Sequence, residues 1–266
     1  MPLVRKLAHF VPLTPDEIIV LRDLQSDRRC VRRHRDIVSV GRRYDTIFVL
    51  VEGFAVRCRV LRNGGRQILN IALPGDFIGF PGAFFESALY SVTALTDTVL
   101  SPIPHAHLLS LFDSYPRLAA KIFWSFACET AMYTEHLIDV GRRSALERVA
   151  HFLLELHARL QIIGLAEDSS YPMLLTQELI GDALGLSVPH VNRTLRQLRD
   201  DDLVTIEKQR VTINDMEALS TLAGFDRAYL DRFRMPEILE EECDQAAGLR
   251  DGAETAGEAQ EFVGAQ

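Results

Sequence analysis

The sequence predicts an α+β chain: an N-terminal antiparallel β-roll, a long helix and a C-terminal winged helix-turn-helix. Three observations support this order. Short apolar runs separated by turn residues fill the first hundred positions, which is typical of a sandwich or barrel-like roll. A stretch with one proline and no glycine follows between 108 and 140. The segment 175–204 then joins two amphipathic helices through a glycine.

Length and composition exclude several classes of protein. The 266 residues, 47% of them hydrophobic, suffice for two domains. No run of eighteen apolar residues exists, so we expect no membrane span. Pro12, Pro15 and Asp16 interrupt the N-terminus, which is therefore no secretory signal. The cysteines are scattered, so we expect no disulfide scaffold, zinc ribbon or compact Fe–S site, and a reduced, cytoplasmic setting. They are Cys30, Cys58, Cys128 and Cys243.

The net charge of −8 comes from one end of the chain. Residues 235–266 hold nine acidic residues and one basic residue, Arg250, so residues 1–234 hold 28 of each sign and sum to zero. The Gly- and Ala-rich end is predicted to be an acidic, disordered tail. The global charge is therefore no argument against nucleic-acid binding.

The predicted roll follows a short helix. Thr14 can cap this helix, Pro15 suits its first position, and Glu17 completes a capping box. After the basic stretch 28–36 come apolar runs rich in branched and aromatic residues, which predict strands. Glycine-containing turns separate them. The predicted strands are 47–53, 54–61, 66–73 and a single one over 91–103, and the predicted turns are 63–65 and 74–76.

A long helix is predicted from about Arg117 to Val140, and a strongly amphipathic helix over 144–160 follows. Five residues form one stripe of the long helix, interrupted by Glu129 and His136. They are Ile122, Phe126, Tyr133, Leu137 and Val140. A helix between two domains favours a dimer interface, and a buried intradomain helix is the alternative. Gly141 is predicted to be the hinge.

The helix-turn-helix carries the most specific local signals. Thr176 caps the first helix, Gly181 is small where two helices cross, and Gly185 suits a left-handed turn. Ser187 is expected to cap the second helix, with Pro189 in its first turn.

The second helix is predicted to have two faces. Val188, Val191, Leu195 and Leu198 are spaced as a buried stripe. Asn192 and Arg193 lie on the other face, where Arg193 suits guanine and Asn192 suits adenine. Arg196 and Arg199 suit phosphate. An ordinary amphipathic helix with a solvated basic face is the alternative.

Two short strands around 207–210 are predicted to form a wing, in which Lys208 or Arg210 contacts a phosphate. A small closing sheet with an exposed charged turn is the alternative, and both can hold. Asp215 is predicted to cap a following helix. Ten residues are predicted to contact DNA: Thr176, Gln177, Ser187, Val188, Pro189, His190, Asn192, Arg193, Arg196 and Lys208.

This order of parts resembles the catabolite-activator and fumarate–nitrate regulator (Crp/Fnr) family of bacterial transcription factors, over roughly Leu13 to Leu222. The segment 181–198, the turns at Gly53 and 63–65, the motif 74–79 and the segment 147–154 carry the resemblance. The resemblance implies a cyclic-nucleotide-binding-like roll of jelly-roll topology, a dimerisation helix and a homodimer on a pseudo-palindromic DNA site. Its half-sites would lie about 34 Å apart. RNA polymerase is an implied partner.

The resemblance also bears on specificity and on the effector. The family commonly has a base-contacting Glu where this chain has Pro189, followed by His190, while Arg193 matches the family's base-contacting arginine. A different half-site is therefore expected. In cyclic-nucleotide-binding members a Glu holds the ribose and an Arg holds the phosphate. Phe80 and Tyr90 occupy these positions here, and neither side chain can replace the contact that it stands for. Cyclic AMP is therefore not expected to be the effector, and no cofactor is predicted.

The aromatic residues near this position predict either an apolar effector cavity or a filled core, and both remain open. They are Phe80, Phe84, Phe85, Tyr90 and Tyr133. The predicted effector pocket is Phe80, Tyr90, Ser91, Tyr133 and Thr134. Cys58 and Cys128 are interpreted as core or buried thiols. His105 and His107 could share one face of a strand, but no further ligand is evident and no metal site is predicted.

The predicted domains are a sensor roll (1–112), a dimerisation helix (113–140), a winged helix-turn-helix (141–222) and a C-terminal helix with the acidic tail (223–266). The favoured function is that of a dimeric DNA-binding regulator with a possible effector. The alternative is a small-molecule-binding regulatory module whose C-terminal domain docks a protein. An enzyme is not expected, because no phosphate loop, nucleophile elbow, zinc-protease motif or dinucleotide fingerprint occurs.

Overall fold

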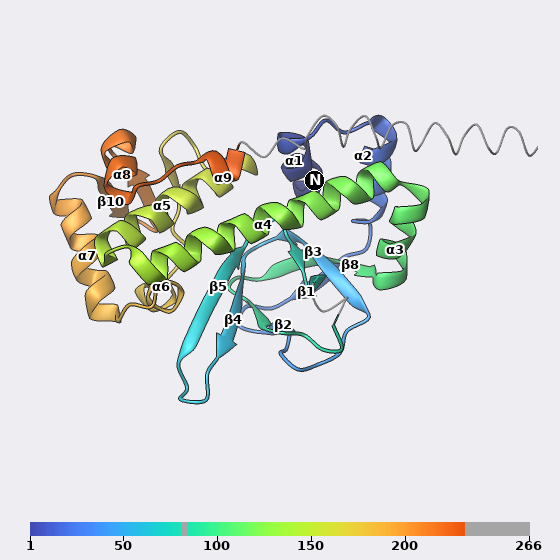
Figure 1. The fold of residues 1–266 in the computed structure, drawn as a ribbon, viewed down its shortest axis with the longest axis horizontal. Helices are drawn as coiled ribbons and strands as arrows, with labels where there is room; N and C mark the ends of the chain where they lie inside the picture. The colour runs from blue at the N-terminus through green and yellow to red at the C-terminus, as the bar shows by residue number, and fades with distance from the viewer. Residues whose placement is uncertain (81–84, 232–266) are drawn as a thin grey trace, which may run out of the picture.

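The computed structural model describes residues 1–80 and 85–231 and has the predicted fold class (Figure 1). The long helix α4 (Pro116–Arg142) runs across the molecule, with the β-roll against one part and the helical C-terminal domain at its far end. The roll strands are β1 (Arg29–Val31), β2 (Asp36–Val38), β3 (Thr46–Glu52), β4 (Ala55–Val60), β5 (Arg66–Ala72), β6 (Phe77–Ile78), β7 (Ser91–Ala94) and β8 (Thr98–Pro104).

Two antiparallel sheets make up the roll in the described chain, in the orders β1-β8-β3-β6 and β2-β7-β4-β5. Residues 91–103 were predicted to be one strand, and this is wrong. β7 pairs with β4 in one sheet, whereas β8 pairs with β3 in the other. The turn at 95–97 lets the chain cross between them. Gly53 is required opposite this turn, because a Cβ there would lie 2.4 Å from the Asp97 carbonyl oxygen.

Two helices precede the roll. The capping box of α2 (Pro15–Asp23) is confirmed, since Thr14 and Glu17 exchange their hydrogen bonds. The helix α1 (Pro2–Phe10) was not predicted, although its Leu3 and Leu7 are buried. Lys121 of α4 is fully buried and forms an ion pair with Glu17 at 2.8 Å. The first helices are thereby attached to α4 by a contact between residues 104 positions apart.

The corner between the sensor and DNA-binding parts follows α4. Gly141 is not the hinge, because it lies within the last turn of α4. The chain turns at Arg143 instead, and Ser144 caps α5 (Ala145–Ile162) in a capping box with Glu147. Arg143 donates to Asp139 at 2.7 Å and thereby secures the corner. The cap is a stronger boundary signal than one glycine, since it satisfies backbone groups at the helix end.

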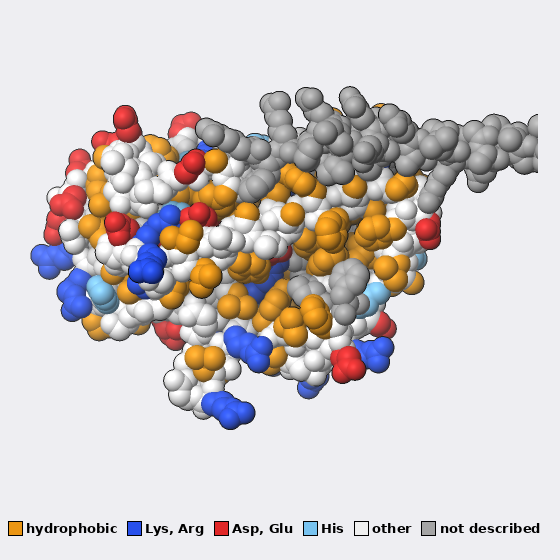
Figure 2. Space-filling model, viewed as in Figure 1, with side chains coloured by type: hydrophobic (Ala, Val, Ile, Leu, Met, Phe, Trp, Pro, Cys, Tyr) orange, Lys and Arg blue, Asp and Glu red, His pale blue; other side chains and the backbone are white. Residues whose placement is uncertain are grey.

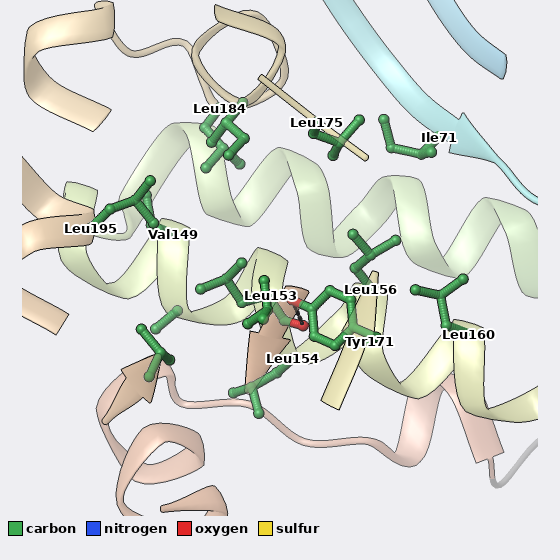
Figure 3. Close-up of a cluster of buried hydrophobic side chains, with 14 of the residues drawn as sticks. Ile71, Val149, Leu153, Leu154, Leu156, Leu160, Tyr171, Leu175, Leu184 and Leu195 are labelled. Carbon is green, nitrogen blue, oxygen red and sulfur yellow. Dashed lines mark hydrogen bonds between the residues drawn. The ribbon is translucent and has the colours of Figure 1, made fainter. Parts of the chain in front are cut away.

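Helix α5 is the centre of the largest hydrophobic core (Figure 3). Its Val149, Leu153 and Leu156 are buried and pack against the strand and helices of the C-terminal domain. Tyr171 is also buried and donates to the Leu153 carbonyl at 3.0 Å. The remaining elements of this domain are β9 (Ser170–Pro172), α6 (Gln177–Leu184), α7 (Val188–Asp200), β10 (Val204–Glu207), β11 (Arg210–Ile213), α8 (Met216–Ala223) and α9 (Ala228–Asp231).

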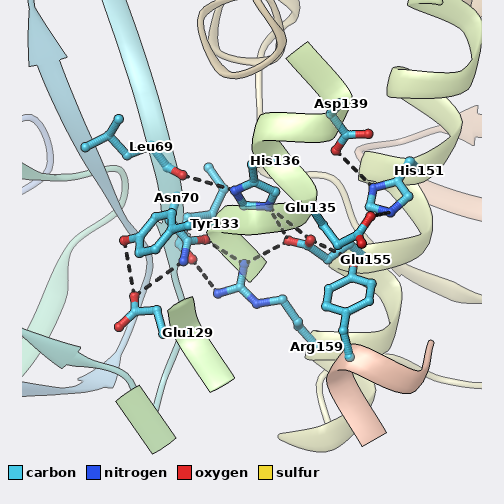
Figure 4. A network of polar contacts seen from close by, with 12 residues as sticks. Leu69, Asn70, Glu129, Tyr133, Glu135, His136, Asp139, His151, Glu155 and Arg159 are labelled. Carbon is cyan, nitrogen blue, oxygen red and sulfur yellow. Dashed lines mark hydrogen bonds and ion pairs between the residues drawn. The ribbon is translucent and has the colours of Figure 1, made fainter. Parts of the chain in front are cut away.

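A set of mostly buried charged and polar side chains joins α5 to the roll. We call it the junction network and define it as Asn70, Asp76, His136, Glu155 and Arg159; Figure 4 labels all of them except Asp76. Arg159 donates to Asn70 at 2.8 Å and lies 3.3 Å from Asp76. His136 of α4 lies 3.0 Å from Glu155. Strand β5, helix α4 and helix α5 therefore each contribute at least one side chain to the junction network.

The charges of the junction network are mutually compensated. Burial disfavours ionisation of Glu155, but His136 and Arg159 hold its pKa down at about 2. Burial also opposes ionisation of Asp76, while Lys6 and Arg159 hold its pKa at about 2. Both carboxylates are thus ionised at neutral pH, and Arg159 lies between them, with His136 beside Glu155 and Lys6 beside Asp76.

The predicted tail and Cys243 lie outside the described residues. Within the described ranges, no helix combines the length and apolarity needed to cross a lipid bilayer.

Candidate nucleic-acid interface and sensor cavity

Helices α6 and α7 form the predicted helix-turn-helix, and the signals of α6 agree with the sequence prediction. The Thr176 hydroxyl accepts the Leu179 N–H at 3.3 Å. Gly185 ends α6 in the left-handed region with φ of 67°. Gly181 lies where α6 meets α7, as predicted, since an added Cβ would lie 3.7 Å from the Val191 side chain, but its tightest contact is with the turn between the two helices. Its backbone carbonyl accepts the Leu186 N–H, and a Cβ at this position would lie 2.5 Å from the Leu186 carbonyl oxygen.

Gly181→Ala should therefore destabilise the DNA-binding domain by about 1–3 kcal/mol, because the obstructing atom is backbone and cannot rotate away. Thermal unfolding should show a lower midpoint for this variant. Arg62→Ala, at the exposed tip of the β4–β5 hairpin, is the control and should keep the wild-type midpoint. Equal midpoints for wild type and the Gly181 variant would contradict the tight turn.

The buried face of α7 differs from the predicted stripe at one residue. Val191, Leu195 and Leu198 are buried as expected, but Val188 is 43% exposed. Thr194 is buried instead and donates to the His190 carbonyl. Val188 lies in the first turn, beyond the edge of the core, so its apolar character does not place it inside.

The opposite face of α7 is open to solvent and defines what we call the recognition face: Val188, Pro189, Asn192, Arg193 and Arg196. Asn192 donates to the Gln177 side chain at 3.2 Å, which joins the start of α6 to this face. Arg196 lies 3.5 Å from Asp200, with both side chains mostly exposed. His190 is half-buried beside the face.

Ser187 precedes α7 but its side chain makes no capping hydrogen bond, contrary to the prediction. A cap accepts from the second or third residue of the helix. Pro189 occupies the second position and has no N–H, which leaves only one candidate donor. The exposed Ser187 hydroxyl therefore remains available beside the recognition face.

The wing is present as a hairpin of β10 and β11. Lys208 and Gln209 form its tight turn, both with positive φ, and Lys208 is exposed. Arg210 is engaged within the domain, since it lies 3.4 Å from Glu167. Strand β9 pairs with β11 and was not predicted, because three residues carry little periodic signal. The predicted Asp215 cap of α8 is confirmed.

A cavity of about 800 Å³ opens between the roll and α4, at the predicted effector position. We call it the sensor cavity. Phe80, Tyr90 and Tyr133 line it, as predicted. Phe80 also stacks on Phe126 of α4, with ring centroids 3.4 Å apart. The other described residues that line the sensor cavity are Leu69, Phe85, Phe123, Ala127, Glu129 and Thr130. Phe84 lies outside the described residues.

Two predicted pocket residues lie elsewhere. The Ser91 hydroxyl accepts the Val40 N–H at 3.0 Å and so holds the loop after β2. Thr134 is on the exposed face of α4 and donates to the Thr130 carbonyl. The structure brings together only the aromatic members of the predicted pocket.

A buried cation beside the sensor cavity has no signal in the sequence. Arg57 of β4 is fully buried, forms an ion pair with Glu129 and donates to the Phe77 carbonyl at 2.6 Å. Its partner lies 72 positions away, so no local pattern indicates the pair. Because Arg57 is already paired with Glu129, it does not offer a free positive charge to a phosphate in the cavity.

The histidine and cysteine interpretations change in one respect. His105 and His107 lie in helix α3 (His105–Ser114), not in a strand, so residues two apart point in different directions. Cys58 is buried and Cys128 is half-buried; burial raises the pKa of Cys128 to about 12. Within the part of the chain that the structure describes, no three metal-ligating side chains gather.

Comparison with known proteins matches both parts of the chain. Residues 28–115 match the family model of the cyclic nucleotide-binding domain, and residues 147–222 match that of the Crp-like helix-turn-helix domain. The transcriptional activatory protein AadR of Rhodopseudomonas palustris is 31% identical over 182 residues, which cover 68% of this chain and 74% of AadR. The nitrogen fixation regulation protein FixK of Azorhizobium caulinodans is 29% identical over 191 residues, covering 71% and 76%.

Among solved structures, FixK2 from Bradyrhizobium japonicum aligns with a TM-score of 0.68 and 25% identity. The alignment covers 75% of this chain and 98% of FixK2. Both matched domains occur in the same order as the roll and the helix-turn-helix described above.

Proposed function

Because the chain belongs to the Crp/Fnr family of DNA-binding transcription regulators, we propose that it binds a pseudo-palindromic DNA site as a homodimer. Helix α7 of each protomer would enter the major groove at one half-site. The observation that carries this proposal is the exposed recognition face of α7, backed by the buried Val191, Leu195 and Leu198. An apolar back and a polar front are what a recognition helix requires.

Each residue of the interface has a role that follows from its chemistry. Arg193 can donate two hydrogen bonds to guanine, and Asn192 can pair with adenine. Pro189 offers no acceptor to cytosine, so the half-site should differ from that of members with Glu at this position. Val188 and His190, beside these residues, would contact base edges or sugar. Five residues suit phosphate contacts: Thr176, Gln177, Ser187, Arg196 and Lys208.

Selection from random duplexes tests the interface. The wild type should return a two-fold related sequence that lacks the half-site preferred by the Glu-containing members. On the selected site Arg193→Ala should bind about 10- to 100-fold more weakly, since a bidentate contact to a base contributes about 1–3 kcal/mol. Arg62→Ala, at the exposed tip of the β4–β5 hairpin, is the matched control. Unchanged binding of the Arg193 variant would contradict this role for α7.

The dimer contact is proposed along the exposed face of α4. Six solvent-facing residues recur at alternating spacings of four and three, which is a heptad pattern. They are Phe123, Ala127, Thr130, Thr134, Leu137 and Gly141; we call them the α4 seam. Hydrophobic side chains gather on this face of the molecule (Figure 2). The small members would let two helices approach closely.

The α4 seam differs from the stripe that the sequence suggested. Ile122 is buried and Phe126 packs toward the roll, so these two residues serve the protomer's own core. Leu137 is 74% exposed and belongs both to the predicted stripe and to the α4 seam. The roll packs against Ile122 and Phe126, whereas the seam stays open to a second copy, and its Phe123, Ala127 and Thr130 also border the sensor cavity.

The sensor cavity supports an apolar or aromatic effector and not a cyclic nucleotide. Its lining is mainly aromatic, and Glu129 occupies its neighbouring guanidinium. Isothermal titration of the protein with cyclic AMP or cyclic GMP should give no more heat than titration with 5′-AMP. Micromolar binding of either cyclic nucleotide would contradict this interpretation.

As a transcription regulator of this family the protein would act in the cytoplasm, next to RNA polymerase bound at the promoter. The family match and the exposed recognition face favour DNA over a protein partner for the C-terminal domain.

A further inference from the structure

A strongly basic segment of the roll has no role in the proposed recognition of bases. Five arginines lie within eight residues, and no acidic residue lies among them. They are Arg28, Arg29, Arg32, Arg33 and Arg35, and we call them the basic strip. All five are exposed: Arg29 lies on β1, Arg28 lies directly before it, and the other three lie on the loop that leads to β2. In a chain with a net charge of −8, such a local concentration of positive charge is a candidate surface for an anionic partner.

The fold leaves the charges of the basic strip unpaired. Among residues 1–80 and 85–231 no carboxylate lies within ion-pair distance of any of these five guanidinium groups. Within the described part of the chain, the side-chain hydrogen bonds of the strip are those of Arg28, to the Asp27 carbonyl and to Ser101.

The neighbouring carboxylates are engaged by other groups. Asp97 accepts the backbone N–H of Arg33 at 2.8 Å. Asp36 accepts the hydroxyls of Thr93 and Ser39. The strip therefore keeps its charge without contributing ion pairs to the roll.

The position of Arg33 connects the strip to the DNA-binding domain. Arg33 lines a groove of about 650 Å³ between the roll and that domain. Thr176, Gln177 and Arg199 line the same groove. Gln177 in turn accepts a hydrogen bond from Asn192 of the recognition face. The groove, whose lining also includes Asp97 and several apolar side chains, thus places Arg33 near the start of α6 and, through Gln177, near the recognition face.

On the basis of the proposed function, we propose that the basic strip binds the phosphates of duplex DNA that flanks the half-site. Arginine suits this task, because its planar guanidinium matches phosphate geometry and is always charged. The contact carries no sequence information and adds affinity through counterion release. The interface with DNA therefore extends from the winged helix onto the sensor roll.

Two duplexes carrying the selected site test this inference. The core duplex ends just outside both half-sites, and the extended duplex continues for about one helical turn, roughly 10 base pairs, on each side. Fluorescence anisotropy is measured at a series of salt concentrations. The wild type should bind the extended duplex about tenfold more tightly, with a steeper dependence of log K on log salt.

The double variant Arg32→Gln/Arg33→Gln should remove this advantage. Its affinity for the core duplex should equal that of the wild type, while the salt slope on the extended duplex falls by about 0.9 for each phosphate that the variant no longer neutralises. Arg22→Gln/Arg62→Gln, which removes two other exposed arginines, should behave as wild type on both duplexes.

Other outcomes would overturn the inference in distinguishable ways. A double variant that keeps the wild-type advantage, or one that binds both duplexes more weakly by the same factor, excludes a flanking contact. Deletion of residues 235–266 provides a further comparison, since this segment carries a charge of −8. If the deletion tightens binding to both duplexes and the double variant abolishes that gain, the strip holds the acidic segment and not DNA. A wild type that binds neither duplex refutes the proposed function itself.

Discussion

Replacing Arg159 by methionine should lower the free energy of unfolding by about 3–5 kcal/mol. Methionine retains the apolar stem, so the change removes mainly the charge and its hydrogen bonds. Asp76 and Glu155 are 5% and 3% exposed, and both would lose a compensating cation. The Ile71 carbonyl and the Asn70 side chain would lose their donors. Removing one partner of a buried ion pair lowers the free energy of unfolding by about this much, because the remaining charge stays buried without a partner.

Urea unfolding at several pH values measures this effect and its origin. The pKa values of Glu155 and Asp76 are held at about 2, below their ordinary values of 4.5 and 3.8. A lowered pKa contributes stability above the ordinary value, and this contribution disappears as the pH falls toward 2. The difference between wild type and variant should therefore be full at pH 7 and shrink below about pH 4.5. Arg22→Met, an exposed arginine of α2, should change little.

A difference that does not depend on pH would show that Arg159 acts through packing alone. The junction network would then hold the DNA-binding domain by shape and not by charge.

Replacing Leu137 by glutamate should convert the dimer to a monomer and weaken DNA binding by about 10²- to 10⁴-fold. Leu137 is 74% exposed in the protomer, so the change should not disturb the fold of a single chain. In the proposed dimer it lies in the α4 seam, where two glutamates would face each other across the symmetry axis. A monomer loses the gain from binding two linked half-sites, and that gain is of this size.

Sedimentation velocity gives the oligomeric state, and anisotropy on the selected site gives the affinity. Ile19→Glu is the matched control, because Ile19 is 61% exposed on α2, outside the seam. It should leave both measurements unchanged. A dimeric Leu137 variant with wild-type affinity would place the dimer contact on another surface. On a duplex with one half-site, wild type and variant should differ little.

Much of the C-terminal domain was predictable because its signals are local. The Thr176 cap, the left-handed Gly185 and the Asp215 cap each depend on contacts within four residues. Their chemistry is therefore visible in the sequence. The turn glycines of the roll follow the same rule. The order of strand-rich, helical and helix-turn-helix segments was predicted for this reason.

The tertiary structure decided everything that depends on distant partners. The periodicity of α7 predicted a buried Val188, but this residue lies in the first turn of the helix, beyond the edge of the core, and is 43% exposed. The run 91–103 gave no sign that it divides between two sheets.

The same holds for the buried charges and the outward face of α4. Arg159 meets Asn70, 89 residues away, and Arg57 meets Glu129 of another element. Sequence alone determined which helices, caps and turns form, because short-range sterics and hydrogen bonds specify them. Only packing determined which face of each helix is covered, since burial and charge compensation depend on what the rest of the fold brings alongside.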